Sequence, residues 1–315
     1  MSNLGDGRDK MTRGCGGKVE ITDLFQGAYD LHVHTGPDVL PRKLDDLEMA
    51  KRLQRLGMKG YGIKSHYFVT SARAKLLNQV YPGMNVIGAI CLNNSVGGLN
   101  PIAVEMAALD GAKIVWMPTF DAENEQQHFR ASKPEKLPHW AKLRQEFERQ
   151  GSPMPTINLF NGRELKHEVY KILRIISKYD LVLATGHLGK DEIFALIEAA
   201  GKIGVKKIVV THPNFPSIRL SIAEQRELAQ RGAYMEHCFT TPHSNKDTWE
   251  SVYEQIHSVG PNHCILSSDL GQPAGPYPDE GMQIFVRNLL DNGFSTGDIR
   301  TMMVDNPSSL VEKEG

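Results

Sequence analysis

The sequence predicts an α/β protein whose eight parallel strands close into a (β/α)8, or TIM, barrel. Three observations predict this fold: eight short apolar runs recur along the chain, helical patterns separate most of them, and polar residues repeatedly stand where the runs end. Parallel neighbours need a crossover connection, which a helix supplies. Near-continuous apolar strands fit a sheet that is covered on both faces, and eight such units can close. An open, doubly wound sheet is the alternative.

The predicted strands extend from residue 28 to residue 269. They are residues 28–34, 59–67, 84–92, 112–120, 181–187, 206–212, 232–238 and 263–269. Between them, apolar residues recur at helical spacing, as in the stripe Val169, Ile172, Leu173 and Ile176. We therefore expect one barrel domain over residues 21–315.

Two segments depart from this repeat. Residues 1–20 are polar and glycine-rich and contain no apolar core of a secretory signal, so we expect a disordered or capping leader. Residues 121–163 separate the fourth strand from its helix, and a connection of that length is usually functional or disordered. Because it leaves the carboxyl end of a strand, we expect an inserted lid over the barrel mouth.

The composition excludes several classes of partner. A net charge of -1 over 315 residues gives no basic field to attract nucleic acid. No run approaches the roughly 18 apolar residues of a membrane helix. Cys15, Cys91, Cys238 and Cys264 are far apart and three lie in apolar runs, which favours reduced thiols and a cytoplasmic protein. We expect a small-molecule substrate as the partner.

Histidines and one aspartate stand at the ends of five predicted strands. They are His32 and His34 in the first strand, His66 in the second, His187 in the fifth, His212 in the sixth and Asp269 in the eighth. The carboxyl ends of barrel strands meet at one face, where active sites are built. Each buried polar group left unpaired would cost roughly 1–3 kcal/mol. A divalent cation removes that cost, because imidazole and carboxylate are its ordinary ligands. The joint pattern therefore predicts a metal site.

Other polar residues have weaker signals. Asp30 can hydrogen-bond a ligand histidine from behind or form a salt bridge at the barrel bottom. Glu236 and His237 point to opposite faces, and we expect Glu236 inside the barrel and His237 outside, with the register open by one residue. The remaining histidines are expected on the surface or in packing: His128, His139, His167, His243, His257 and His263. The glycine-rich loops lack a nucleotide-binding spacing, so no nucleotide cofactor is expected.

The motifs DLHVHT, TGH, THP and SSDLG, in this order, resemble the amidohydrolase superfamily of metal-dependent hydrolases. The closing stretch MMVDNPSSLV (302–311) resembles the NP-containing helix that ends many members. The resemblance implies that His32, His34 and Asp269 bind one metal and that His187 and His212 bind a second. It also implies zinc as the cation, with manganese or iron as alternatives, and self-association into a homo-oligomer.

The fourth strand departs from the family pattern. It lacks the lysine or glutamate that bridges two metals, and Asp121 and Glu123 lie beyond its expected end. Lys64 can supply a carbamate from the second strand, or His66 can be an extra ligand. The motif DLHVHT with a histidine in the second strand also resembles the polymerase-and-histidinol-phosphatase family, which favours His66. The bridge and the number of metals, one or two, stay open.

A reaction follows from these expectations. A divalent metal lowers the pKa of its bound water to about 7 and polarises the group under attack. Asp269 can take the proton, and Lys64 or His237 can stabilise the developing oxyanion. We expect hydrolysis of an amide, ester, lactone or phosphoester. The alternatives are a metal-dependent decarboxylase of the same superfamily and a barrel that binds metal or ligand without turnover.

Overall fold

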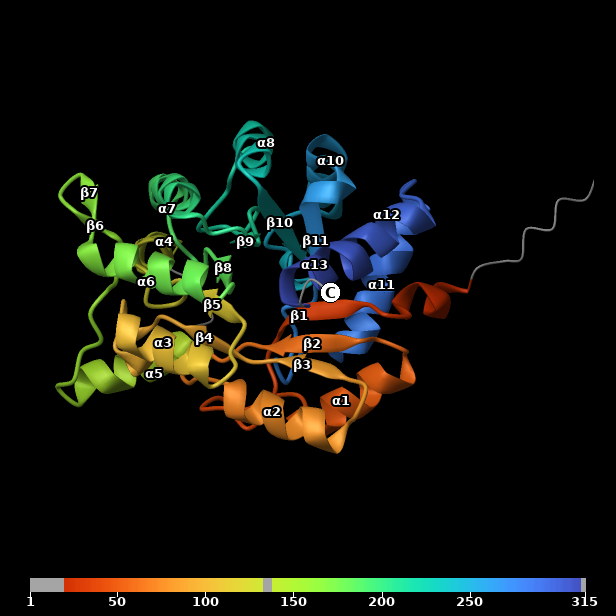
Figure 1. Cartoon of the computed structure of the whole chain (residues 1–315), viewed down its shortest axis with the longest axis horizontal. Helices are drawn as coiled ribbons and strands as arrows, with labels where there is room; N and C mark the ends of the chain where they lie inside the picture. The colour runs from red at the N-terminus through yellow and green to blue at the C-terminus, as the bar shows by residue number, and fades with distance from the viewer. Residues whose placement is uncertain (1–19, 133–137, 313–315) are drawn as a thin grey trace, which may run out of the picture.

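The computed structural model describes residues 20–132 and 138–312, and its strands lie at the centre of a ring of helices (Figure 1). All of the predicted leader except Glu20 lies outside the described residues. The barrel strands are β1 (Tyr29–Val33), β2 (Gly60–Ile63), β3 (Asn85–Ile87) with β4 (Ala89–Cys91), β5 (Ile114–Trp116), β8 (Val182–Ala184), β9 (Ile208–Thr211), β10 (Ala233–Cys238) and β11 (Cys264–Ser267). Each paired neighbour among them is parallel.

The strands form two sheets that meet at two junctions. One sheet has the order β1-β2-β3 and the other β11-β10-β9-β8-β5-β4. At the first junction β3 continues into β4 through Gly88. At the second, the amide of Asp269 donates to the carbonyl of His32 (2.9 Å), and the amide of His34 donates to the carbonyl of Leu270 (2.8 Å). These bonds complete the ring, so the predicted barrel class is confirmed and the open sheet does not form.

The third predicted strand, 84–92, differs from expectation because it is broken at Gly88. A Cβ at residue 88 would lie 2.4 Å from the Cα of Ser71, at the start of the helix that precedes β3. The hydroxyl of Thr70 accepts the amide of Ala89 at 2.8 Å and so replaces a ladder partner there. The close approach of this helix end thus divides one strand into β3 and β4.

Helices surround the barrel and cap it. The ring consists of α1 (Asp46–Arg55), α2 (Ser71–Val80), α3 (Pro101–Leu109), α6 (His167–Lys178), α7 (Lys190–Ile203), α8 (Ile222–Gln230), α10 (Trp249–Val259) and α11 (Pro278–Asp291). Shorter elements are η1 (Ile21–Phe25), η2 (Asn94–Val96), α9 (Thr240–His243), η3 (Pro261–His263), α12 (Thr296–Arg300), the π turn η4 (Thr301–Asp305) and α13 (Asn306–Val311). Among the described helices, none combines the length and apolar character of a membrane span.

The core has two layers, one on each side of the strands. Inside the barrel, a small cluster includes Tyr29, Leu31, Trp116 and Ile265, together with Leu310 and Val311 of α13. The hydroxyl of Tyr29, at the amino end of β1, donates to Glu312 at 2.7 Å. The C-terminal helix therefore closes the barrel at the end opposite the histidines. The larger cluster lies between the strands and the helical ring.

The insertion after β5 contains α4 (Glu123–Ser132), α5 (His139–Arg149) and a hairpin of β6 (Phe160–Asn161) and β7 (Glu164–Leu165). Asp121, which follows the end of β5 at Trp116 after a short loop, holds this insertion in place. Its Oδ1 accepts from Nη1 of Arg144 in α5 (2.5 Å), and its Oδ2 accepts from the amide of Asn94 (2.9 Å). Both side chains of the Arg144–Asp121 pair are buried. The first part of α5 is thereby held at the barrel mouth.

Candidate metal centre

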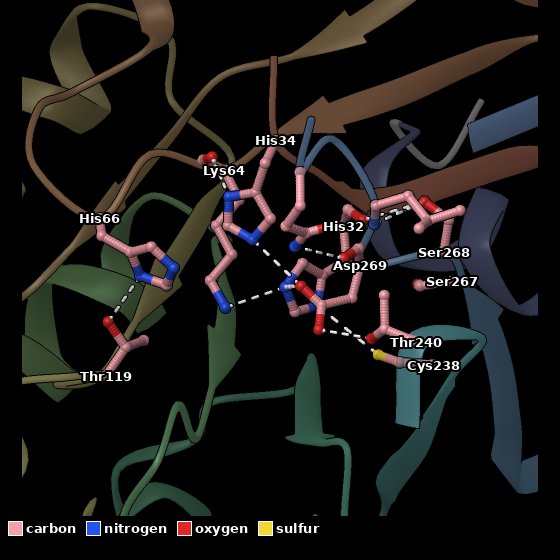
Figure 2. A network of polar contacts seen from close by, with 12 residues as sticks. His32, His34, Lys64, His66, Thr119, Cys238, Thr240, Ser267, Ser268 and Asp269 are labelled. Carbon is pink, nitrogen blue, oxygen red and sulfur yellow. Dashed lines mark hydrogen bonds and ion pairs between the residues drawn. The ribbon is translucent and has the colours of Figure 1, made fainter. Parts of the chain in front are cut away.

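Three side chains from the first and last barrel strands converge on one point (Figure 2). Nε2 of His32 and Nε2 of His34 each lie 3.1 Å from Oδ1 of Asp269. His32 in β1 and His34, which directly follows this strand, point to the same face because they are two residues apart. Asp269 follows β11, which the ring closure places beside β1. Oδ2 of Asp269 accepts from the hydroxyl of Thr240 (2.8 Å), which fixes the carboxylate plane.

The backbone takes unusual conformations at two of the predicted ligands. Asp269 has φ of +51° and His212 has φ of +29°, in the left-handed region that non-glycine residues rarely adopt. Such conformations concentrate at functional sites, where the surroundings hold them. Gly271 permits the turn that follows Asp269, because a Cβ there would lie 1.6 Å from the carbonyl oxygen of His34.

The hydrogen bonds of His34 fix its tautomer. Its Nδ1 lies 2.9 Å from the carbonyl oxygen of Lys64, which can only accept, so Nδ1 carries the proton. Burial, and then the charge of Arg42, lower the pKa of His34 to about 3, so the ring is neutral. Burial alone would raise the pKa of Asp269, but the charge of His32 opposes this and holds that pKa well below its ordinary value. Two lone pairs, on Nε2 of His34 and on an ionised carboxylate, therefore face each other. A cation between them resolves the repulsion.

His32 has a carboxylate behind it and a cation in front. Its Nδ1 lies 3.2 Å from Oε2 of Glu236, whose Oε1 accepts from the hydroxyl of Ser267 (2.9 Å). Its Nε2 lies 2.9 Å from Nζ of Lys64. Burial and Lys64 act to lower the pKa of His32, but Asp269 and Glu236 outweigh them and raise it. A carboxylate behind a histidine orients the ring and raises its basicity as a ligand.

The spacing of these atoms fits a shared metal ion. Zinc binds nitrogen and oxygen at about 2.0–2.2 Å, so two ligand atoms of a tetrahedral site lie about 3.3 Å apart. The two separations of 3.1 Å match that value. A second group, formed by His32, Glu236 and Cys238, also brings its ligand atoms together. It fits less well, because burial raises the pKa of the Cys238 thiol and neither Glu236 nor Cys238 lines the cavity described below.

His66, His187 and His212 lie beside this point. The ring centroids of His34 and His66 are 4.8 Å apart, and those of His187 and His212 are 4.9 Å apart. Burial is the main cause that lowers the pKa of all three, so they are neutral. Nδ1 of His212 is buried without a hydrogen-bond partner in the described part of the chain. The structure thus brings all six predicted ligands together.

Two of these rings have polar neighbours outside the strands that carry them: His66 has a hydrogen bond, and His187 has a nearby carboxylate. Nδ1 of His66 lies 2.8 Å from the hydroxyl oxygen of Thr119. Nδ1 of His187 lies 3.3 Å from Oε2 of Glu125, a residue of α4. The inserted segment therefore supplies a carboxylate to the histidine cluster, which the sequence pattern did not indicate.

A cavity of about 270 Å³ opens onto the histidines. Its wall includes His34, Lys64, His66, His187, His212 and Asp269, together with Arg42, Phe120, Glu125, His139, Trp140, Phe215 and Lys246. His139 was expected to have a surface or packing role, and its place in the wall corrects this, because α5 begins at the mouth. The sequence analysis also missed Arg42, Lys246 and the aromatic residues, whose loops carry no motif.

Several other expectations need correction. Asp30 accepts from the amides of His32 (3.2 Å) and Ser268 (3.0 Å), so it braces backbone rather than a histidine ring or a salt bridge. Glu236 faces the barrel interior as expected. His237 is buried on the other side and does not line the cavity, so it does not reach a substrate oxygen. Glu123 accepts from Asn158 (2.9 Å) and, like Asp121, lies away from the ligands.

Comparisons with known proteins identify a family and a fold. The model of a family of unknown function, DUF6282, matches residues 27–236. The chain belongs to this family. A comparison with curated proteins found no match.

Solved structures with a similar fold include amidohydrolases and related hydrolases. An amidohydrolase from Pseudomonas aeruginosa has a TM-score of 0.61 at 11% identity, covering 93% of this chain and 98% of that one. A putative 2-pyrone-4,6-dicarboxylic acid hydrolase from Pseudomonas putida has a TM-score of 0.57 at 14% identity, with coverage of 91% and 99%. The probable dipeptidase PvdM from Pseudomonas aeruginosa has a TM-score of 0.61 at 10% identity, with coverage of 92% and 95%. The DUF6282 chain therefore has an amidohydrolase-like fold.

Proposed function

We propose that the protein is a metal-dependent hydrolase that cleaves an amide, ester, lactone or phosphoester of a small molecule. The observation that carries this proposal is the pair of lone pairs on Nε2 of His34 and Oδ1 of Asp269, 3.1 Å apart at the floor of a cavity. His32, His34 and Asp269 would hold one divalent cation, with zinc the expected ion and manganese or iron alternatives. His187 and His212 would hold a second, and His66 stands close enough to join either.

The residues of the site have distinct tasks. A bound divalent cation lowers the pKa of water and polarises the substrate oxygen. Asp269 accepts the proton from the attacking water, since its pKa is held low and the carboxylate is ionised. Thr240 keeps Oδ2 of Asp269 oriented during this transfer. Asp269 then returns the proton to the leaving group.

Lys64 would stabilise the negative charge that develops on the substrate oxygen. It is 1% exposed and lines the cavity, so its charge acts where water is largely excluded. No carboxylate lies within ion-pair distance of its Nζ in the described part of the chain. An ammonium without a carboxylate partner keeps its charge available for an anionic transition state.

The test is turnover by protein reconstituted with zinc, manganese or iron, across a panel of amides, esters, lactones and phosphoesters. Hydrolysis by the wild type, loss of about a thousandfold or more in Asp269→Asn, and an unchanged thermal midpoint are expected. Asp191→Asn, an exposed change on α7, is the matched control and should keep full activity. Wild-type turnover by Asp269→Asn would remove Asp269 as the base. Release of carbon dioxide without water addition would assign a decarboxylase instead.

A further inference from the structure

The cavity wall carries more positive than negative charge. Its lining includes three cations, Arg42, Lys64 and Lys246, and two carboxylates, Glu125 and Asp269. The described wall therefore has one more cationic side chain than carboxylates, and a bound divalent cation would add to this excess. A site with this field favours an anionic ligand.

Arg42 is held rigidly in this wall, and some of its N–H donors have no acceptor among the described residues. Its Nε and Nη2 both donate to Oδ2 of Asp38, at 2.8 and 2.6 Å. Asp38 is itself fixed, because its Oδ1 accepts from the amide of Val39 (2.8 Å) and the hydroxyl of Ser65 (3.1 Å). The side chain of Arg42 is 7% exposed, and its Nη1 makes no hydrogen bond within the described residues.

This arrangement suits recognition of a carboxylate. The guanidinium is charged at all ordinary pH values and planar, and its orientation is set before a ligand arrives. Its remaining N–H groups are donors without an acceptor, while the side chain lines the cavity beside His34. Preorganised donors of this kind bind an anion with little loss of conformational entropy.

Lys246 is the second cation of the wall that stands apart from the metal ligands. Its Nζ lies 4.3 Å from the ring centroid of Phe215, and it has no carboxylate within ion-pair distance in the described part of the chain. Phe215 packs against His212 with a centroid separation of 4.5 Å. One aromatic ring therefore links Lys246 to the histidine cluster.

Aromatic side chains form another part of the wall. Phe120 and Trp140 are stacked, with centroids 6.1 Å apart and planes inclined by 21°. Trp140 belongs to α5, which the Arg144–Asp121 pair holds at the mouth. Such surfaces favour an apolar, flat body, and the cavity volume of about 270 Å³ limits it to a small molecule.

We propose that the substrate is a small carboxylic acid with a flat apolar body, whose carboxylate is bound by Arg42 and attracted by Lys246 while its cleavable group lies at the histidine cluster. The identity of the reacting group rests on the proposed function. Binding of the carboxylate by Arg42 and Lys246, which we call the acid site, does not depend on turnover.

The experiment compares two ligands of nearly equal shape, terephthalate and 4-acetylbenzoate, by calorimetric titration of zinc-loaded protein. Neither ligand can be hydrolysed. Terephthalate offers one carboxylate to the metal and one to the cationic wall. In 4-acetylbenzoate the carboxylate is the better zinc ligand, so a neutral ketone is left to face the cationic wall. Wild-type protein should prefer terephthalate by about tenfold or more, as expected for a charge-assisted hydrogen bond. Arg42→Lys, which keeps a charge beside Asp38 but removes the fork, and Lys246→Met should each reduce the preference by about threefold or more.

Lys171→Met on the exposed face of α6 is the matched control, and it should retain the wild-type preference. Equal affinity of the wild type for both ligands would overturn the proposal, as would an unchanged preference in both Arg42→Lys and Lys246→Met. Lys246 is exposed, so its variant tests the proposal even if the Arg42 variant unfolds. A preference without any hydrolysis would keep the acid site and remove the proposed function. Hydrolysis without a preference for terephthalate would keep the proposed function and remove the acid site.

Discussion

Nζ of Lys64 lies 2.9 Å from Nε2 of His32, the same nitrogen that faces Asp269. Nδ1 of His32 is directed to Glu236, so Nε2 is the nitrogen left to bind a cation. The ammonium and a metal ion therefore compete for one lone pair, and they also repel each other. Substitution of Lys64 can therefore distinguish the two roles that the sequence left open, a carbamate ligand of the metal and a cation that stabilises the oxyanion.

Replacing Lys64 with methionine removes the competitor and its charge. We expect metal affinity to rise by about tenfold, because a like charge disfavours the cation in a buried site, while turnover falls. Titration with zinc in a competing chelator measures the affinity. The opposite result would be weaker metal binding by Lys64→Met, together with a wild-type metal affinity that depends on dissolved carbon dioxide. That result would make Lys64 a carbamate ligand.

Replacing Glu236 with glutamine should weaken metal binding without direct loss of a ligand. The carboxylate behind His32 orients the ring, and removal of such partners typically costs about 10–100-fold in metal affinity. Cys238→Ala is the control, since its Sγ lies 3.7 Å from Nδ1 of His32 and is not an expected ligand. If the Cys238 variant lost metal as strongly as the Glu236 variant, the metal site would be the group formed by His32, Glu236 and Cys238.

His237 should make the protein sensitive to acid. Burial lowers its pKa from 6.5 to about 4, so between these pH values the unfolded chain binds more protons than the folded one. The contribution of neutral His237 to the free energy of unfolding is therefore complete above pH 6.5. It is lost as the pH falls toward 4, and the total loss is about 3 kcal/mol. Urea unfolding of His237→Leu at pH 7 and pH 4.5 should show a smaller loss than the wild type. His167→Leu, exposed at the start of α6, should lose as much as the wild type, and equal losses in all three proteins would disprove the assignment.

The Arg144–Asp121 pair should hold the inserted segment in place. Arg144→Leu leaves Asp121 buried without its cation, and breaking a buried pair in this way costs about 3–5 kcal/mol of unfolding free energy. The double variant Arg144→Leu with Asp121→Asn should recover part of that loss, because the unpaired charge is gone. Thermal unfolding measures both, and additive losses in the double variant would show that the two side chains do not stabilise each other.

The sequence predicted the barrel and the cluster of ligands because both follow from short-range patterns. Strand ends with the same polarity bring His32, His187 and Asp269 to one face in any closed parallel barrel, whatever the details of packing. The break at Gly88 was not predictable, since it depends on the approach of Ser71 from a neighbouring helix. Local patterns carry no information on such contacts.

The residues that determine which ligand the cavity binds could also not be predicted from the sequence. Arg42 looks like an ordinary loop arginine until Asp38 and Ser65 are seen to fix it. Arg130 and Lys133 lie in the inserted segment, where solvated surface charges are the ordinary interpretation. Arg130 is exposed and does not line the cavity, and Lys133 lies outside the described residues. Tertiary contacts, rather than position in a charged segment, determine which cation faces the ligand.

The central claim is that one cation sits on Nε2 of His32, Nε2 of His34 and Oδ1 of Asp269. Anomalous diffraction from crystals of zinc-loaded protein tests it most directly. We predict a strong peak within bonding distance of these three atoms, with any second peak beside His187 and His212. A crystal soaked to saturation that shows no peak there, or a peak between Glu236 and Cys238 instead, would contradict the account.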